Sequence, residues 1–115
     1  MAKLNLYGLK NCDTCKKAMK ALDQKGIEYD FIDIRAEADL STKVTTWLSS
    51  VGIEKLLNKR STTWRTLSKA EQEAALKEKT QSTLENNPTL IKRPVIEAEK
   101  TIYVGWTKDI QESLI

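Results

Sequence analysis

Two cysteines, Cys12 and Cys15, are the residues of this chain best suited to do chemistry. They form a Cys-x-x-Cys motif between a short apolar run at residues 3–7 and a helical pattern that begins at Asp13. The first turn of a helix leaves backbone N–H groups unpaired, and these groups favour a nearby anion. Three lysines add positive charge within a few residues: Lys10, Lys16 and Lys17. Both effects favour the thiolate, which is the reactive form of cysteine.

The two sulfurs are expected to differ in exposure. In a helix from Asp13, four apolar residues recur at i, i+3, i+4 and i+7 and form one face: Cys15, Ala18, Met19 and Leu22. Cys12 precedes this face, in the loop or at the helix cap, where a substrate can reach it. We interpret Cys12 as the attacking thiol and Cys15 as a candidate resolving thiol. The alternative is a small core residue at Cys15 and an ordinary loop residue at Cys12, but the strand–loop–helix context favours the redox interpretation.

The absence of histidine excludes several classes of site. No Ser-His-Asp triad or Cys-His pair can form. Two cysteines without histidine cannot supply the usual four ligands of a structural zinc site, so we expect no bound metal. Activation of a cysteine must therefore come from the backbone, lysine or arginine.

The bulk composition is that of an ordinary soluble domain, with 115 residues, 40% hydrophobic and 30% charged. A net charge of +3 permits an anionic substrate. It does not predict direct nucleic-acid binding, which needs a clustered basic face. No apolar run is long enough to span a membrane, and no apolar signal region precedes the first strand. Together with two cysteines that are not expected to form a structural bridge, this predicts a cytoplasmic protein.

The first third of the chain predicts a βαβ unit. Residues 3–7 read as a strand, residues 13–24 as a helix that stops before Gly26, and residues 27–34 as a second strand. Because a helix connects the two strands, they should be parallel.

The middle of the chain predicts helices. Residues 40–51 carry the clearest amphipathic pattern, which Gly52 ends, and a short helix should follow near residues 53–57. Residues 59–63 are expected to form a basic loop, rich in hydroxyl groups.

Two further helices are indicated by capping boxes. Ser68 and Ser82 each precede a glutamate by three residues, which is the spacing of this motif. We therefore expect helices near residues 69–79 and 83–86.

The last part predicts two short antiparallel strands, at residues 95–96 and 101–104, joined by a link at residues 98–100. Thr107 should cap a final helix. The order βαβ, helical block, ββα predicts an α/β, thioredoxin-like fold with a mixed four-stranded sheet. We expect a single domain, residues 1–115, with a helical insertion at about 38–87.

A second candidate constellation is Lys92-Arg93-Pro94. In a thioredoxin-like sheet, a proline that opens this strand would face the cysteine loop. Arg93 could then hold an anion beside Cys12, since guanidinium suits oxyanions and carboxylates. The alternative is a solvated basic pair, which local sequence alone slightly favours. Arg60 could supply another positive group, although a solvated loop arginine fits its spacing at least as well.

Three segments resemble the arsenate-reductase-like family, which includes the ArsC, Spx and YffB proteins: Tyr7–Ala18, Leu56–Arg65 and Asn87–Val95. The resemblance spans nearly the whole chain. It implies a thioredoxin-like fold with a helical insertion. It also implies Cys12 as the catalytic thiol, and Arg93, before a cis Pro94, as an anion-binding arginine.

Within this family the chain is most similar to the YffB-type thiol reductases. The resemblance therefore implies a thiol–disulfide oxidoreductase that uses glutathione as a co-substrate, with no bound cofactor. Glutaredoxin is a candidate partner. The expected substrate- or glutathione-binding residues are Lys10, Asn11, Lys16, Arg60, Arg93 and Pro94.

Two other branches supply alternatives. Glutaredoxin-coupled arsenate reductases have a histidine where this chain has Gly8 and an arginine where it has Lys16. Such losses should weaken the binding of arsenate. Spx-type regulators bind RNA polymerase and use a Cys-x-x-Cys redox switch, which Cys12 and Cys15 match. Gly52 lies in the insertion, where such regulators make their contact. We rank these alternatives second and third.

Overall fold

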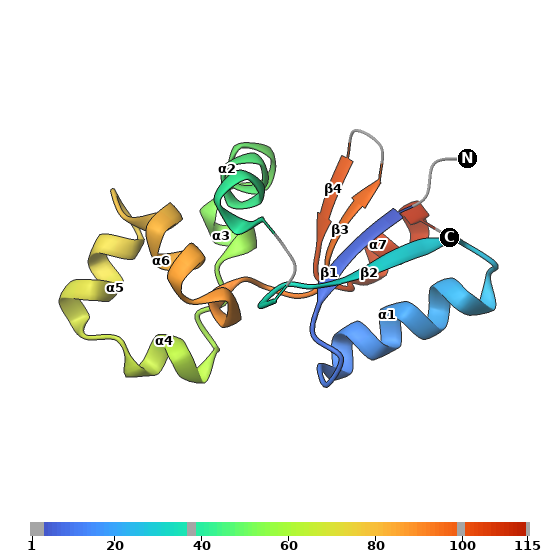
Figure 1. Cartoon of the computed structure of the whole chain (residues 1–115), viewed down its shortest axis with the longest axis horizontal. Helices are drawn as coiled ribbons and strands as arrows, with labels where there is room; N and C mark the ends of the chain where they lie inside the picture. The colour runs from blue at the N-terminus through green and yellow to red at the C-terminus, as the bar shows by residue number, and fades with distance from the viewer. Residues whose placement is uncertain (1–3, 37–38, 99–100, 115) are drawn as a thin grey trace. The chain divides into compact units, whose positions relative to one another are not determined.

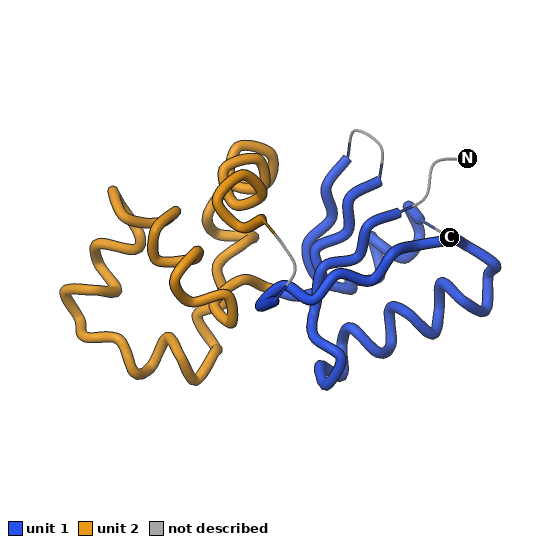
Figure 2. Tube along the Cα trace, viewed as in Figure 1, with its two compact units in different colours: residues 1–38, 93–115 blue, residues 39–92 orange. Residues whose placement is uncertain are grey.

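The computed structural model describes residues 4–36, 39–98 and 101–114. The chain divides into two compact units (Figure 2). Unit 1 comprises residues 1–38 and 93–115, and unit 2 comprises residues 39–92. The single domain with an insertion near residues 38–87, which the sequence predicts, stays a prediction.

Unit 1 contains a mixed four-stranded sheet in the order β2-β1-β3-β4 (Figure 1). β1 (Leu4–Gly8) and β2 (Tyr29–Asp33) are parallel, joined through α1 (Asp13–Gln24). β3 (Val95–Ala98) is antiparallel to both β1 and β4 (Thr101–Val104). This confirms the predicted βαβ and ββ pairings and the thioredoxin-like topology.

The ends of three strands differ from the prediction. Gly8, which was expected to follow the first strand, pairs with Asp33 and is the last residue of β1. β2 is shorter than residues 27–34, because the Ile27 N–H donates to the Leu22 carbonyl and continues the turn after α1. Ala98 pairs with Thr101 and so belongs to β3, not to the link. The rest of that link, residues 99–100, lies outside the described residues.

One hydrophobic cluster holds unit 1 together on a single face of the sheet. Its buried members come from two strands and α1: Leu4, Leu6, Ala18, Leu22 and Ile96. Leu4 and Leu6 share a face because strand side chains alternate, and Ala18 and Leu22 share one because they are four residues apart on a helix. Leu114 of α7 (Lys108–Leu114) packs against the same cluster, so α1 and α7 cover the same face. Thr107 caps α7 as predicted, since its Oγ1 accepts from the Ile110 N–H at 3.3 Å.

Unit 2 is helical. Its elements are α2 (Leu40–Val51), α3 (Ile53–Leu56), α4 (Thr62–Thr66), α5 (Lys69–Ala75), α6 (Thr80–Asn86) and the 3₁₀ helix η1 (Pro88–Leu90). Gly52 ends α2 at φ +84°, a conformation that favours glycine, and α3 begins directly after it. An isolated antiparallel bridge joins Leu57, which follows α3, to Ile91, which follows η1. No helix in the described ranges has the length and apolarity needed to cross a membrane.

The two predicted capping boxes have different outcomes. The box at Ser68 is confirmed: Ser68 Oγ accepts from the Glu71 N–H at 3.1 Å, and Glu71 Oε1 accepts from the Ser68 N–H at 2.8 Å. The box at Ser82 is wrong, because α6 already begins at Thr80. Ser82 therefore lies within α6, where its hydroxyl donates to the Lys79 carbonyl at 3.3 Å and does not cap a helix start.

Two other boundaries also differ. Residues 59–63 are not all loop, because Ser61 Oγ accepts from the Thr63 N–H at 3.2 Å and starts α4 at Thr62. α5 ends at Ala75 and not near residue 79, since the Lys79 N–H donates to the Ala74 carbonyl at 2.9 Å and closes a turn.

Candidate active site

The cysteine motif lies where β1 passes into α1. After Gly8 the chain turns, and the Cys12 N–H donates to the Leu9 carbonyl at 3.1 Å. Cys12 is the N-cap of α1, with extended backbone angles, and its carbonyl accepts from the Lys16 N–H at 2.9 Å. A residue at this position lies beside the unpaired N–H groups of the first turn. The local fold therefore places the Cys12 sulfur at the positive end of the helix.

The two thiols differ in exposure as predicted. Cys12 is partly exposed, whereas Cys15 is 0% exposed and packs with the apolar face of α1. Both are free thiols. A reagent or substrate from solvent can therefore reach Cys12 and cannot reach Cys15 without a local movement.

Opposing effects act on the pKa of Cys12. Partial burial removes water and raises this pKa, but hydrogen bonds from the backbone N–H and the thiol of Cys15 lower it. The charge of Arg93 and a hydrogen bond from its guanidinium lower it further. The lowering effects together outweigh burial, so the pKa of Cys12 lies below its ordinary value.

The pKa of Cys15 moves the other way. Burial raises this pKa to about 12, against the hydrogen bond that the thiol receives from the Leu9 backbone. The hydrogen bond that Cys15 donates to Cys12, and the negative charge on Cys12, raise it further. Of the two thiols, Cys12 is therefore the one that ionises more readily, and Cys15 is the neutral donor of the pair.

Arg93 enters the site from the start of β3. The bond between Arg93 and Pro94 is cis, and the Pro94 carbonyl accepts from the Gly105 N–H at 2.8 Å. Arg93 Nη1 is buried and has no hydrogen-bond partner among the described residues. Buried polar groups are normally paired, so this nitrogen has the geometry of a donor awaiting an acceptor. An anion that binds next to Cys12 would supply that acceptor.

The other predicted binding residues, apart from Pro94, are exposed. Lys10, Asn11 and Lys16 are exposed, in the loop and the first turn of α1. The cation that acts on Cys12 is Arg93. Arg60 belongs to unit 2, where its side chain is exposed and its backbone N–H donates to Asn58 Oδ1 at 3.1 Å. The binding roles of these four residues stay predictions.

Sequence reasoning missed two contributors, Gly8 and Leu9. The Leu9 backbone hydrogen bonds to the Cys15 thiol, and Gly8 lies against the same sulfur. A glycine that ends a strand just before a cysteine loop was the available signal. Among the described residues, no three His, Cys, Asp or Glu side chains gather as metal ligands.

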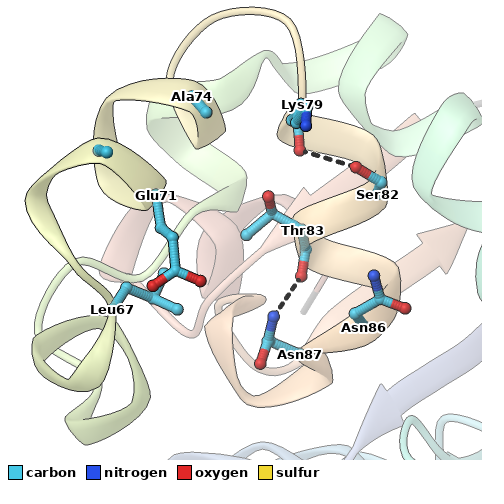
Figure 3. Close-up of a pocket in the computed structure, with 9 residues that line it drawn as sticks. Leu67, Glu71, Ala74, Lys79, Ser82, Thr83, Asn86 and Asn87 are labelled. Atoms are coloured by element: carbon cyan, nitrogen blue, oxygen red, sulfur yellow. Dashed lines mark hydrogen bonds between the residues drawn. The ribbon is translucent and has the colours of Figure 1, made fainter.

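Unit 2 has a pocket of about 440 Å³ that contains none of the predicted site residues (Figure 3). It lies between α5 and α6, with Leu67 and Ala74 among its apolar lining. Much of its polar lining is already engaged. Ser82 donates to the Lys79 carbonyl, and Asn87 Nδ2 donates to the Thr83 carbonyl at 3.0 Å. This pocket therefore shows no arrangement of groups for chemistry.

Comparison of the sequence with known proteins gives one family. The model of the ArsC family matches residues 7–113. An uncharacterized protein of Haemophilus influenzae is 39% identical over 105 residues, which are 91% of this chain and 92% of that protein. The global transcriptional regulator Spx of Staphylococcus saprophyticus is 27% identical over 108 residues, which are 92% of this chain and 82% of the regulator.

Solved structures give the same grouping. A YffB protein aligns with a TM-score of 0.88 and 33% identity, over 96% of this chain and 97% of that one. An arsenate reductase (ArsC) related protein from Brucella melitensis has a TM-score of 0.78 and 32% identity, over 97% and 93% of the two chains. An arsenate reductase from Vibrio cholerae, with a TM-score of 0.70 and 12% identity over 98% of each chain, shares the fold.

Proposed function

Because the chain belongs to the ArsC family, with the thioredoxin-like fold of its YffB relative, we propose that it is a glutathione-dependent thiol–disulfide oxidoreductase acting through Cys12. One observation carries this proposal. Cys12, whose pKa is lowered, lies beside Arg93, whose buried Nη1 has no partner in the described part of the chain. A nucleophile and an unused anion donor together suit a substrate that carries a disulfide and a carboxylate. A glutathione mixed disulfide has both groups.

In the first step the Cys12 thiolate attacks the glutathione sulfur of the mixed disulfide. A Cys12–glutathione disulfide forms, the original disulfide breaks, and the released thiolate takes a proton from water. Arg93 Nη1 donates a charge-assisted hydrogen bond to a glutathione carboxylate. The planar guanidinium group suits this acceptor. The partly exposed position of Cys12 allows this approach.

In the second step a thiolate attacks Cys12 or its attached glutathione. Attack by a second glutathione on the glutathione sulfur releases oxidised glutathione and regenerates the Cys12 thiolate. Attack by Cys15 on the Cys12 sulfur releases glutathione and leaves a Cys12–Cys15 disulfide, which external thiols then reduce. Once Cys12 is in a disulfide, it no longer carries the negative charge that raises the pKa of Cys15. Burial still disfavours the Cys15 thiolate, which favours glutathione as the resolving thiol.

The test is turnover of a glutathionylated peptide with glutathione, glutathione reductase and NADPH. We expect Cys12→Ser to abolish turnover. Cys15→Ser is the matched control, since it makes the same atomic change three residues away, and it should retain turnover if glutathione resolves the intermediate. Wild-type turnover in Cys12→Ser would disprove the assignment. Arsenate in place of the peptide tests oxyanion reduction, an alternative that similarity to an arsenate reductase (ArsC) related protein supports.

Similarity to proteins named global transcriptional regulators supports a second candidate, a redox-sensing regulator that binds RNA polymerase. This reading requires a surface on unit 2, and Gly52 between α2 and α3 is the residue to change. Recovery of RNA polymerase with the tagged wild-type protein, and not with Gly52→Arg, would favour it. Absence of polymerase alongside turnover of the peptide would favour the reductase.

A further inference from the structure

Gly8, the last residue of β1, lies directly against the buried thiol of Cys15. A Cβ atom at position 8 would lie 2.5 Å from Cys15 Sγ and 3.4 Å from Cys15 Cβ. Favourable contacts between heavy atoms begin near about 3.5 Å, so the first of these distances is a clash. The sulfur therefore occupies the space that any other side chain at position 8 would need.

Neither side of this contact can easily withdraw. Gly8 pairs with Asp33 in the sheet, and its carbonyl accepts from the Ile34 N–H at 3.0 Å, which fixes its backbone. Cys15 is 0% exposed, and its sulfur is held by hydrogen bonds with the Leu9 backbone and with Cys12. A close-packed interior leaves little room for a displaced sulfur. A side chain at position 8 would therefore move the sulfur out of these hydrogen bonds.

We propose that Gly8 is a positioning residue for the thiol pair, because its missing side chain leaves the space from which Cys15 donates a hydrogen bond to Cys12. The proposal rests on the proposed role of Cys12 and adds a residue that acts on it only through Cys15. Gly8 is not among the glycines with positive φ, so its backbone conformation is open to alanine. Gly8→Ala thus probes the contact with the sulfur and not a backbone requirement.

The experiment compares four proteins: wild type, Gly8→Ala, Cys15→Ala and the double variant. The rate of iodoacetamide alkylation of Cys12 against pH gives its pKa in each. In the presence of Cys15, Gly8→Ala should raise the pKa of Cys12 by about half a unit, which lowers the thiolate fraction below that pKa about threefold. In the Cys15→Ala background the same change should have no effect, because the displaced sulfur is absent.

Two results would overturn the proposal. One is an unchanged pKa of Cys12 in Gly8→Ala, and the other is the same rise in both backgrounds, which would mean that Gly8 acts without Cys15. Folding is checked by circular dichroism. If Gly8→Ala does not fold while the double variant does, the sulfur contact is confirmed; if neither folds, Gly8 has another role and the proposal is wrong.

The thermal midpoints of the same four proteins separate this proposal from the proposed function. Gly8→Ala should lower the midpoint when Cys15 is present and should leave it unchanged or higher in the Cys15→Ala background. That pattern does not depend on catalysis. If the pattern holds while wild-type Cys12 titrates at its ordinary pKa, the contact is real and the proposed function is the part that fails.

Discussion

Three groups from two neighbouring residues lower the pKa of the Cys12 sulfur. The backbone N–H and the thiol of Cys15 donate to it, and Arg93 adds a charge and a hydrogen bond. The sequence predicted the helix start and the division between an exposed and a buried thiol. It assigned the positive charge to nearby lysines as well as to Arg93, because spacing along the chain cannot show which cation the sheet brings close. Arg93 is 81 positions away in sequence, and only the pairing of β1 with β3 connects it to Cys12.

Changing Arg93 should affect both the nucleophile and the binding of the substrate. Arg93→Met removes the charge and the donors, so we expect the pKa of Cys12 to rise. The KM for a glutathionylated peptide should rise about tenfold, because the loss of one charge-assisted hydrogen bond weakens binding by about that factor. Arg93→Lys should restore part of the pKa effect, since a lysine keeps the charge without the planar fork. Alkylation against pH and steady-state kinetics measure the two effects.

Arg35→Met is the matched control for this change. Arg35 also belongs to unit 1, is exposed, and makes a backbone hydrogen bond to Asp33 that the substitution leaves in place. It should leave both the pKa of Cys12 and the KM unchanged. Equal effects of the two methionine substitutions would show that Arg93 acts only through the overall charge.

At the scale of the elements, periodic patterns predicted which segments are helices and strands better than they predicted where those segments end. α1 and α2 have the predicted bounds, because each carries an apolar face and a glycine lies at or just after its end. Ser68 and Ser82 show the limit of local motifs. Both have the capping-box spacing, but only Ser68 lies at a helix start. The spacing alone cannot distinguish a cap from two residues on one helical face.

The two serines therefore make a direct test of the helix boundaries. Ser68→Ala should lower the free energy of unfolding by about 1 kcal/mol, because the Glu71 N–H loses its acceptor. Ser82→Ala should change it by no more than a few tenths of a kcal/mol, in the stabilising direction, because alanine is the better helix former. Urea denaturation measures both. A larger loss in Ser82→Ala than in Ser68→Ala would mean that α6 begins at Ser82, as the sequence pattern indicated.

The whole-molecule topology was accessible from the sequence because its connections leave few choices. A helix between two adjacent strands requires parallel pairing, and a short link requires antiparallel pairing. Contacts that depend on the absence of a group were not accessible. The glycine before the cysteine loop is visible in the sequence, but the sulfur that fills the space beside it is not. The Nη1 of Arg93, which lacks a partner among the described residues, has no signature in residue types either.

The stability of the reduced protein should depend on pH through Cys15. The folded state keeps this thiol neutral up to a pKa of about 12, whereas an unfolded chain ionises it near about 8.5. Above pH 8.5 the unfolded state therefore binds fewer protons, and the free energy of unfolding should fall as pH rises, by up to about 1.4 kcal/mol per unit. Cys12 does not add to this decline, because a thiol whose pKa is lowered by folding changes stability with pH in the opposite direction.

Urea unfolding of wild type and Cys15→Ala in reductant, between pH 7.5 and 10.5, isolates the contribution of Cys15 to the pH dependence of stability. The difference in unfolding free energy between the two proteins should shrink above pH 8.5. Parallel curves would show that the Cys15 thiol is not held neutral by the fold.

The most direct test of the account is the reactivity of each thiol in the native protein as a function of pH. Isotope-coded alkylation followed by peptide mass spectrometry reads Cys12 and Cys15 separately in one sample. We predict that Cys12 reacts as a thiolate clearly below the ordinary value of about 8.5, while Cys15 stays unreactive throughout the range in which the protein is folded. Titration of both thiols near their ordinary value, or slower reaction at Cys12 than at Cys15, would contradict the claim that this site holds an activated nucleophile.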